Sequence, residues 1–306
     1  MMRKKRDAEH DDKNLDLFSH SGSAAQRPDE PEVKRLNAPV WTENKARFIS
    51  LYLYYFVLIT KHGTYIDACA GPQDPDHPET WAAKLVLDRE PRFLRHFFLF
   101  DIKPDQVERL DRLKARQPSK DSKGRKLQRE IVVEKGDCNR LIPALLDSGV
   151  LRKEATFCLL DQRTFECHWA TVEALAHYKE PQDTKIEIFY FLASGWLGRA
   201  LKETEDDAIL VAWWGRDDWA NLRSMTGQQI LEEMVARFHN ELNYRSVKSW
   251  PIFDKKTGGR VMYHMLHATD HPEAPTLMAR AYNRATRRRE PPEQFLLWAR
   301  ENIPGK

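Results

Sequence analysis

Cysteine is scarce in this 306-residue chain, and its thiols form no recognisable redox motif. The four cysteines are Cys69, Cys138, Cys158 and Cys167, and no CxxC pair or regular spacing links them. Three of them lie in or beside apolar, strand-like segments. This usage is typical of a reduced, intracellular protein with buried thiols and not of a disulfide framework.

Long hydrophobic runs are also missing. The longest, from Phe48 to Thr60, is too short to cross a bilayer, and its aromatic residues follow a helical spacing. The basic start, Met1 to Arg6, is not followed by the apolar stretch that a signal peptide needs. We therefore expect a cytoplasmic protein without a membrane segment.

The chain lacks a strong excess of charge of one sign and several common catalytic motifs. Charged residues make up 31% of the sequence, yet the formal net charge is only +3, so the molecule as a whole is not a basic nucleic-acid-binding protein. Neither HExxH, GxSxG nor a P-loop is present, which argues against zinc metalloproteases, serine hydrolases and P-loop NTPases.

What is present is an alternation of strand and helix patterns. Residues 1–36 are polar and interrupted by Pro and Gly, which predicts a disordered tail, and the main domain is expected over 37–290. After a helix over Lys45–Ile59, helices separate apolar segments. The expected strands are Thr64–Ala70, His96–Phe100, Ile131–Val133, Thr156–Leu160 and Ile186–Leu192. This alternation predicts an α/β fold with a mostly parallel, doubly wound sheet.

The C-terminal half follows a different pattern. A helical insertion is expected at about 196–243, and Val247–Phe253 and Arg260–Ala268 flank a turn with a glycine pair, as in an antiparallel hairpin. Parallel strands completed by one antiparallel hairpin form a Rossmann-like class I methyltransferase fold. A further helix is predicted within 291–306.

Four of the predicted strands end in a carboxylate, and right-handed crossovers would bring these ends to one edge of the sheet. The first, at Asp67, leads into a small-residue turn, Ala70-Gly71-Pro72, where backbone amides could approach a ligand closely. That turn predicts a place for the amino-acid part of S-adenosylmethionine; an ordinary tight turn is the alternative. Asp101, after the second strand, would accept the ribose hydroxyls, or else cap the helix after Pro104.

The third and fourth strand ends complete the candidate site. Asp137 could accept the adenine amino group, cap the following helix, or do both. Asp161 or Gln162 could accept a hydrogen bond from a target amino group while Phe165 stacks on a flipped base. The alternative there is a loop in which Asp161 caps a helix and Phe165 fills the core.

Two further clusters have a functional and a structural interpretation. The segment Arg109–Arg129 holds nine Lys or Arg residues and could follow a phosphate backbone, although a solvated loop is the more common meaning of such a run. His264, His267 and His271 resemble a metal set, but on a strand the first two would point to opposite faces, so core or site-lining histidines are favoured and no metal site is predicted.

Several of these segments together resemble the three-Cys-motif partner proteins, a bacterial and phage-associated family. They are Trp41-Thr42-Glu43-Asn44-Lys45, Tyr65-Ile66-Asp67, Ala70-Gly71-Pro72, Gly136-Asp137, Trp213-Trp214-Gly215 and Tyr263 to Pro272. The resemblance implies a methyltransferase-like fold and a neighbouring protein with three cysteines as a possible partner. Two places depart from the family pattern: Gln73 replaces a glycine, and no Asp-Pro pair follows the fourth strand at Asp161.

The sequence thus predicts an S-adenosylmethionine-dependent methyltransferase-like protein acting on a nucleic-acid base nitrogen. Two other functions stay open. The first is a non-catalytic scaffold for a partner protein, which the two departures favour. The second is a metal-dependent nucleic-acid-processing enzyme, which would need the four strand-end aspartates to form a compact cage.

Overall fold

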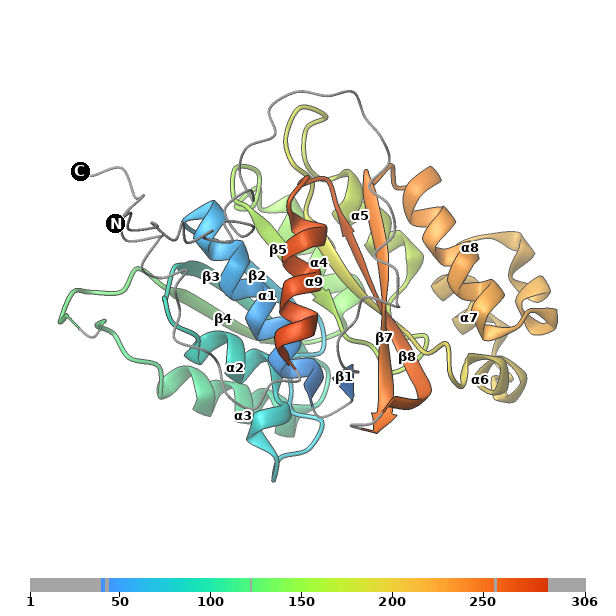
Figure 1. The fold of residues 1–306 in the computed structure, drawn as a ribbon, viewed down its shortest axis with the longest axis horizontal. Coiled ribbons are helices and arrows are strands. Elements are labelled where there is room, and N and C mark those ends of the chain that lie inside the picture. The colour runs from blue at the N-terminus through green and yellow to red at the C-terminus, as the bar shows by residue number, and fades with distance from the viewer. Residues whose placement is uncertain (1–39, 42–43, 122, 256–257, 286–306) are drawn as a thin grey trace, which may run out of the picture. The chain divides into compact units, whose positions relative to one another are not determined.

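The computed structural model describes residues 40–41, 44–121, 123–255 and 258–285. The expected tail over 1–36 and the expected helix within 291–306 lie outside these ranges. The described residues form an α/β structure with helices on both faces of a mostly parallel, Rossmann-like sheet (Figure 1).

The sheet has eight strands in the order β1-β7-β8-β6-β5-β2-β3-β4. Their bounds are β1 (Val40–Trp41), β2 (Gly63–Asp67), β3 (Leu94–Asp101), β4 (Glu130–Lys135), β5 (Thr156–Leu160), β6 (Glu187–Leu192), β7 (Ser246–Lys255) and β8 (Gly258–Thr269). Strand β8 pairs antiparallel with both β6 and β7, whereas all the other strand pairs are parallel. The expected hairpin is therefore confirmed, and its second strand is inserted between β6 and β7.

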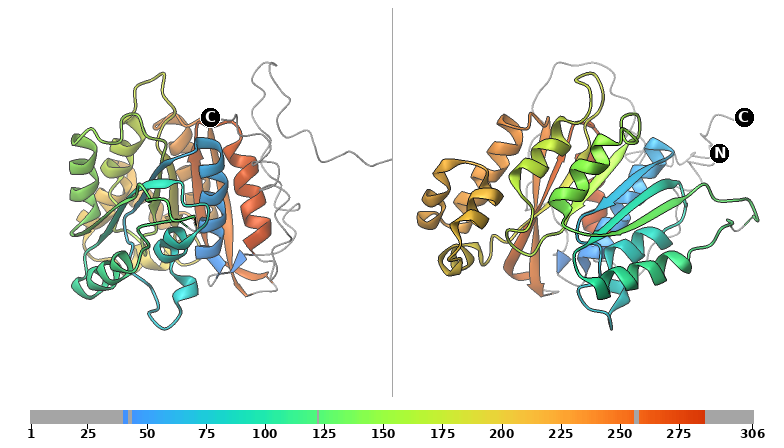
Figure 2. Two further views of the ribbon diagram at one scale, coloured as in Figure 1. Left: turned by 90° about the vertical axis from the view of Figure 1, so that its left-hand side faces the viewer. Right: turned by 180° about the vertical axis from the view of Figure 1, so that it is seen from behind.

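Helices cover both faces of the sheet. Their bounds are α1 (Lys45–Thr60), α2 (Ala82–Asp88), α3 (Pro104–Ala115), α4 (Cys138–Asp147), α5 (Trp169–His177), α6 (Leu197–Glu203), α7 (Asp207–Trp214), α8 (Gly227–Asn240) and α9 (Ala274–Ala285). Figure 2 shows α1 and α9 packed side by side on one face, with α4 and α5 on the other. Short 3-10 helices cover Pro78–Thr80 and Asp217–Ser224.

The amino-acid pattern explains where the strands lie. Strands β5 and β6 are buried along their whole length, because both faces are covered and both edges are paired, and their sequences are correspondingly almost wholly apolar. Strand β4, at the edge of the sheet, is only partly buried and carries charged residues at its ends. The edge strand β1 was not predicted from the sequence, because two residues are too few to show an alternating pattern. It is a strand because it pairs in parallel with β7.

Helix ends follow the expected local chemistry. Pro104 occupies the first turn of α3 with Lys103 at the N-cap, as predicted. Helix α7 ends at Gly215, whose φ of 73° lies in the left-handed region that favours glycine. Helix α1 begins after Asn44 and buries nearly all its residues, because the sheet, α2 and α9 surround it. Among the described residues, no helix combines the length and apolar character needed to span a bilayer.

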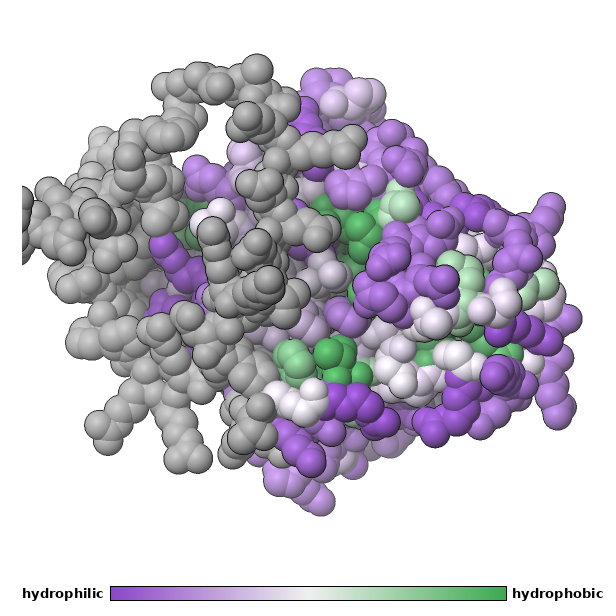
Figure 3. All heavy atoms as spheres, turned by 45° about the vertical axis from the view of Figure 1, so that its right-hand side comes forward, coloured by the Kyte–Doolittle hydropathy of each residue, from purple (hydrophilic) through white to green (hydrophobic). Residues whose placement is uncertain are grey.

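The described surface is mainly polar around the helices that connect β6 to β7. Figure 3 shows this side of the molecule covered largely by hydrophilic residues, with smaller apolar areas between them. The exposed apolar side chains on helix α7 are Ile209 and Val211. The buried aromatic residues Trp213 and Trp214 of the same helix face the core. The tryptophans of this region thus serve largely in packing.

Candidate functional site at the carboxyl edge of the sheet

The turn after β2 is held by the neighbouring strand and by the chain that follows it. The backbone N–H of Ala70 donates to the carbonyl of Phe100, at 2.8 Å. The indole N–H of Trp81 donates to the carbonyl of Ala70, at 2.6 Å. Pro72 is buried and Gln73 is exposed. The loop is therefore tightly packed against the end of β3, as an ordinary turn between strand and helix would also be.

Asp101 holds this turn at its glycine. One carboxylate oxygen accepts the backbone N–H of Gly71 at 3.0 Å, and the other accepts that of Lys103 at 3.0 Å. A Cβ at Gly71 would lie 2.6 Å from Asp101 Oδ2 and 2.6 Å from Gln106 Cβ, so only glycine fits there. The carboxylate is half-buried and retains lone pairs. Its proposed contact with ribose hydroxyls stays a prediction.

Asp67 is the most deeply buried acid of the set, with 1% of its surface exposed. It accepts hydrogen bonds from the Tyr65 hydroxyl (2.7 Å) and the Cys69 backbone N–H (3.3 Å). Burial, reinforced by the nearby charge of Asp161, raises the pKa of Asp67 to about 7 although its hydrogen bonds act in the opposite direction. Asp67 therefore changes its charge near neutral pH.

Asp161 forms a buried ion pair that was not predicted from the sequence. The Nζ atom of Lys45, at the start of α1, lies 2.8 Å and 2.6 Å from the two carboxylate oxygens. The Lys45 side chain is 5% exposed and that of Asp161 is 10% exposed. Burial by itself lowers the pKa of Lys45, but the charge and hydrogen bond of Asp161, together with Tyr263 and Asp67, outweigh burial, so the pKa is raised. The ammonium also lies 5.6 Å from the centre of the Tyr263 ring.

Lys45 is thus the functional candidate that the sequence analysis missed. Its signal was present, because Lys45 is a cation at the start of a helix whose other faces are apolar. A single lysine in that position is usually solvated, however, and nothing in the sequence shows that α1 crosses the end of β5. Only the fold brings together residues that are 116 positions apart.

Asp137 acts as the N-cap of α4, which is one of its two predicted roles. Its carboxylate accepts the backbone N–H of Asn139 at 2.9 Å and the side-chain amide of the same residue at 2.9 Å. The Asn139 amide in turn donates to the carbonyl of Glu166 and accepts from the backbone N–H of His168. Asn139 therefore joins the turn after β4 to the turn after β5.

The structure corrects the predicted placement of Gln162 and Phe165. Gln162 is 2% exposed, and its amide is hydrogen-bonded at both ends, to the carbonyl of Phe191 and to the N–H of Cys167. Phe165 is 8% exposed and packs edge-on against Trp213, with 5.0 Å between ring centres. Both side chains are engaged in the turn and the core. The structural alternative holds for Phe165.

The histidines of β8 and its C-terminal turn are separated, as their strand positions predict. His267 lies in the core and contacts Glu187, with 2.9 Å between Nε2 and Oε2. His264 contacts the hydroxyl of Ser194 at 2.7 Å, and the backbone N–H of His271 donates to the Thr269 hydroxyl. Within the described ranges, no three His, Cys, Asp or Glu side chains are arranged to hold a metal ion. The acidic cage required by a metal-dependent enzyme is not formed by these residues.

The basic segment Arg109–Arg129 leads to the side of the sheet where the parallel strands begin, opposite the side where they end. It runs from α3 to the start of β4, whereas the candidate site lies where the parallel strands end (Figure 1). Asp121 accepts hydrogen bonds from Arg125 within this loop. A nucleic acid bound by the loop would therefore meet the molecule away from Asp67, Asp101 and Asp161.

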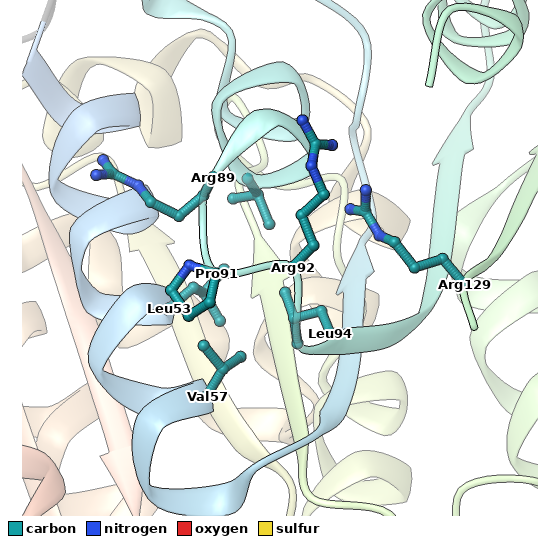
Figure 4. A pocket seen from close by; sticks show the side chains of 8 residues that line it. Leu53, Val57, Arg89, Pro91, Arg92, Leu94 and Arg129 are labelled. Atoms are coloured by element: carbon teal, nitrogen blue, oxygen red, sulfur yellow. The ribbon is translucent and has the colours of Figure 1, made fainter. Parts of the chain in front are cut away.

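The arginines at the base of this loop serve the fold. Arg92 and Arg129 lie side by side near a hollow of about 10 Å³, which has room for a single water molecule (Figure 4). Both donate to Gln117 Oε1 at 3.3 Å and to the carbonyl of Leu87. Burial and the nearby charge of Arg92 lower the pKa of Arg129 to about 10. These contacts connect the end of α2 to the start of the loop.

No family model matches the chain, and no curated protein does. The chain is similar to a crystal structure of a Legionella pneumophila protein of the family DUF519, with 12% sequence identity and a TM-score of 0.43. That similarity covers 80% of this chain and 93% of the other.

Proposed function

We propose that this chain binds S-adenosylmethionine at the carboxyl ends of β2 and β3 and transfers its methyl group to a nitrogen of a nucleic-acid base. The strand order carries the proposal. A parallel set β4-β3-β2-β5-β6, followed by antiparallel β8 and then β7, is the order of the class I methyltransferase core. In open α/β sheets the ligand lies where the strand order reverses, which here is between β2 and β5.

The residues at that point fit the cofactor by charge and shape. The turn at Gly71 leaves no room for a side chain, which is typical of a close backbone approach. Asp101, at the end of the adjacent strand, has the acceptor chemistry that ribose hydroxyls require. Asp67, whose pKa is raised to about 7, and the Lys45–Asp161 pair lie at the same strand ends as this turn. When bound, the cofactor supplies an activated methyl group.

The residues of this chain would bind and orient the acceptor. Lys45 forms an ion pair with Asp161, and a carboxylate in such a pair acts as a hydrogen-bond acceptor. Asp161 would accept a hydrogen bond from the target amino group. This bond would direct the nitrogen of that group toward the methyl group. Positioning would account for most of the rate enhancement, because the reacting partners are already activated.

Titration calorimetry with S-adenosylmethionine and S-adenosylhomocysteine tests the proposal. Wild type is expected to bind in the micromolar range. Asp101→Asn keeps an oxygen that can accept the Gly71 N–H but has fewer acceptors for a ribose, so its affinity should fall at least tenfold. Asp147→Asn, an exposed acid at the end of α4, is the matched control and should bind as wild type does. The absence of binding at millimolar ligand would contradict the proposal.

A second candidate function, a non-catalytic scaffold, is favoured by one observation. Gln162 and Phe165, two of the three residues expected to meet a base, are engaged in the core. A three-cysteine partner protein would then be the binding partner that the resemblance implies. The same calorimetry separates the two functions, because a scaffold without cofactor binding would give no heat in any variant.

A further inference from the structure

A polar cavity lies at the carboxyl ends of the parallel strands, beyond the end of β6. The chain leaves β6 at Leu192, passes through Ser194 and Gly195, and enters α6. The first residue of α8, Gly227, and the β8 residues Arg260 and Met262 form the other walls. The cavity has a volume of about 300 Å³, within the range of small-ligand sites. We call it the Arg199–Arg260 cavity after its two charged lining residues.

Backbone contacts that only glycine allows hold its walls together. The N–H of Gly195 donates to the carbonyl of Met262 at 2.9 Å. A Cβ at Gly195 would lie 2.1 Å from that carbonyl oxygen, and a Cβ at Gly227 would lie 2.1 Å from the carbonyl oxygen of Ser194. The cavity is therefore bounded by close main-chain packing, which gives it a defined shape.

The lining carries positive charge without a compensating acid. Arg199 and Arg260 are exposed and come from different elements, the helix α6 and the strand β8. In the part of the chain that the structure describes, neither guanidinium forms an ion pair with a carboxylate, and no Asp or Glu lines the cavity. Arg260 donates to the thioether of Met262, a weak acceptor. Two guanidinium groups in such a lining have the charge and the donors that an anion requires.

The cavity also lies next to the candidate site. Its wall residue Trp196 packs edge-on against Tyr263, with 6.1 Å between ring centres. The ammonium of Lys45, which binds Asp161, lies 5.6 Å from the centre of the same Tyr263 ring. The Tyr263 ring thus contacts both the cavity wall, at Trp196, and the ion pair, at Lys45.

We propose that the Arg199–Arg260 cavity binds a phosphate group, that of the nucleic-acid strand whose base would enter the site at Asp161. This inference rests on the proposed function for the identity of the strand, but not for the anion. Guanidinium groups match the oxygens of a phosphate, and contacts from the two arginines that line the cavity would fix the strand without reading its sequence. The basic loop at the opposite edge is not needed for this contact.

The test compares three proteins: wild type, the double variant Arg199→Gln/Arg260→Gln, and Arg152→Gln. Arg152 is an exposed arginine just before β5, at the opposite edge of the sheet, and serves as the matched control. Binding of a fluorescent single-stranded oligonucleotide is measured by anisotropy over a range of salt concentrations. The double variant should lose about tenfold or more in affinity, and the magnitude of its log–log salt slope should fall by about 0.7 for one lost phosphate contact. The control should match wild type.

Inorganic phosphate and a nucleoside monophosphate distinguish the source of the phosphate. If wild type binds these but no oligonucleotide, and the double variant binds neither, the anion site stands and its ligand is a free phosphate compound. Equal oligonucleotide binding by wild type and the double variant overturns the proposal, as does a wild type that binds none of the three probes. Calorimetry with S-adenosylmethionine on the same proteins reports separately on the proposed function, because both arginines lie outside the cofactor turn.

Discussion

The ammonium of Lys45 lies within 2.8 Å of both carboxylate oxygens of Asp161, in an ion pair that is almost fully buried. The pair connects the first helix of the structure to the end of a central strand, close enough to Asp67 for the charge of Asp161 to act on its pKa. Each partner compensates the charge of the other, since neither has enough water around it. Loss of either partner alone would therefore leave a buried charge without compensation.

Removing one partner of this pair should be costly. We expect Lys45→Met to lower the free energy of unfolding by about 3–5 kcal/mol, because Asp161 would stay buried without a counter-charge. Urea denaturation at pH 8 measures the effect. The double variant Lys45→Met/Asp161→Leu should recover part of the loss, since no buried charge is left. A double variant whose loss equals the sum of the two single losses would show that the two side chains do not interact.

The raised pKa of Asp67 makes stability depend on pH. The folded protein holds this proton up to about pH 7, whereas the unfolded chain releases it near 3.8, the ordinary pKa of an aspartate. The stabilisation is therefore complete below about pH 4 and is lost as pH rises through about 7. Each pKa unit corresponds to about 1.4 kcal/mol, so the loss is on the order of 4 kcal/mol.

Asp67→Asn isolates this contribution, because asparagine is neutral at every pH and can still accept the hydrogen bond from Tyr65. The variant should gain stability relative to wild type between pH 5 and pH 8. Unfolding curves in urea at several pH values give the difference. A constant difference across this range would show that Asp67 does not titrate there.

The close packing around Gly71 can be tested by adding a single methyl group at this residue. Gly71→Ala places a Cβ 2.6 Å from Asp101 Oδ2 and Gln106 Cβ. We expect a loss of about 1–3 kcal/mol in unfolding free energy from overpacking, together with weakened binding of S-adenosylmethionine. Gly198→Ala is the control, because an added Cβ there meets nothing within 4 Å. Thermal unfolding and calorimetry would show whether the two variants differ.

A buried hydrogen-bond network joins helix α1 to strands β6 and β8. The Tyr52 hydroxyl donates to Glu187, which also contacts His267 in the core. Burial and the neighbouring charge of Glu187 raise the pKa of Tyr52, so the hydroxyl stays protonated and remains a donor. Tyr52→Phe should cost about 1–3 kcal/mol, because Glu187 would lose a donor. Tyr178→Phe should be nearly neutral, since the Tyr178 hydroxyl has no hydrogen-bond partner among the described residues. Chemical denaturation of both variants checks this contrast.

Phe165 tests the corrected placement. If it belongs to the core, Phe165→Leu should lower the unfolding free energy by up to about 1.5 kcal/mol and leave oligonucleotide affinity unchanged. A ring that stacks on a base would give the reverse pattern, since stacking contributes about 1–3 kcal/mol per base. Anisotropy and urea denaturation on the same preparation separate the two outcomes.

The sheet itself could be predicted from the sequence. Strand β5 was predicted with its observed bounds, and the hairpin β7–β8 followed from its glycine pair, because local periodicity and turn chemistry decide such elements. The expected continuous helical stretch after Gly195 is divided into three helices and a 3-10 segment. Its breaks depend on packing against the sheet, which no local pattern reveals.

The positions of the candidate site residues at the strand ends could be predicted from the sequence, whereas their contacts could not. Asp67, Asp101, Asp137 and Asp161 lie at the ends of parallel strands because topology alone puts them there. Which of them is buried, paired or capping depends on distant residues, such as Lys45 for Asp161 and Asn139 for Asp137. Likewise, the placement of Phe165 depends on Trp213, which belongs to the insertion.

Helix α1 is covered by the last described helix, and this has a consequence for biosynthesis. The side-chain amide of Asn44 donates to the carbonyl of Ala285 at 3.1 Å, and α9 packs along α1. A ribosome releases α1 long before it makes α9, so the nascent chain exposes an apolar helix while more than two hundred residues are translated. Such surface is what chaperones bind and what drives premature association. The packing of α9 is therefore the last of the described contacts that bury α1.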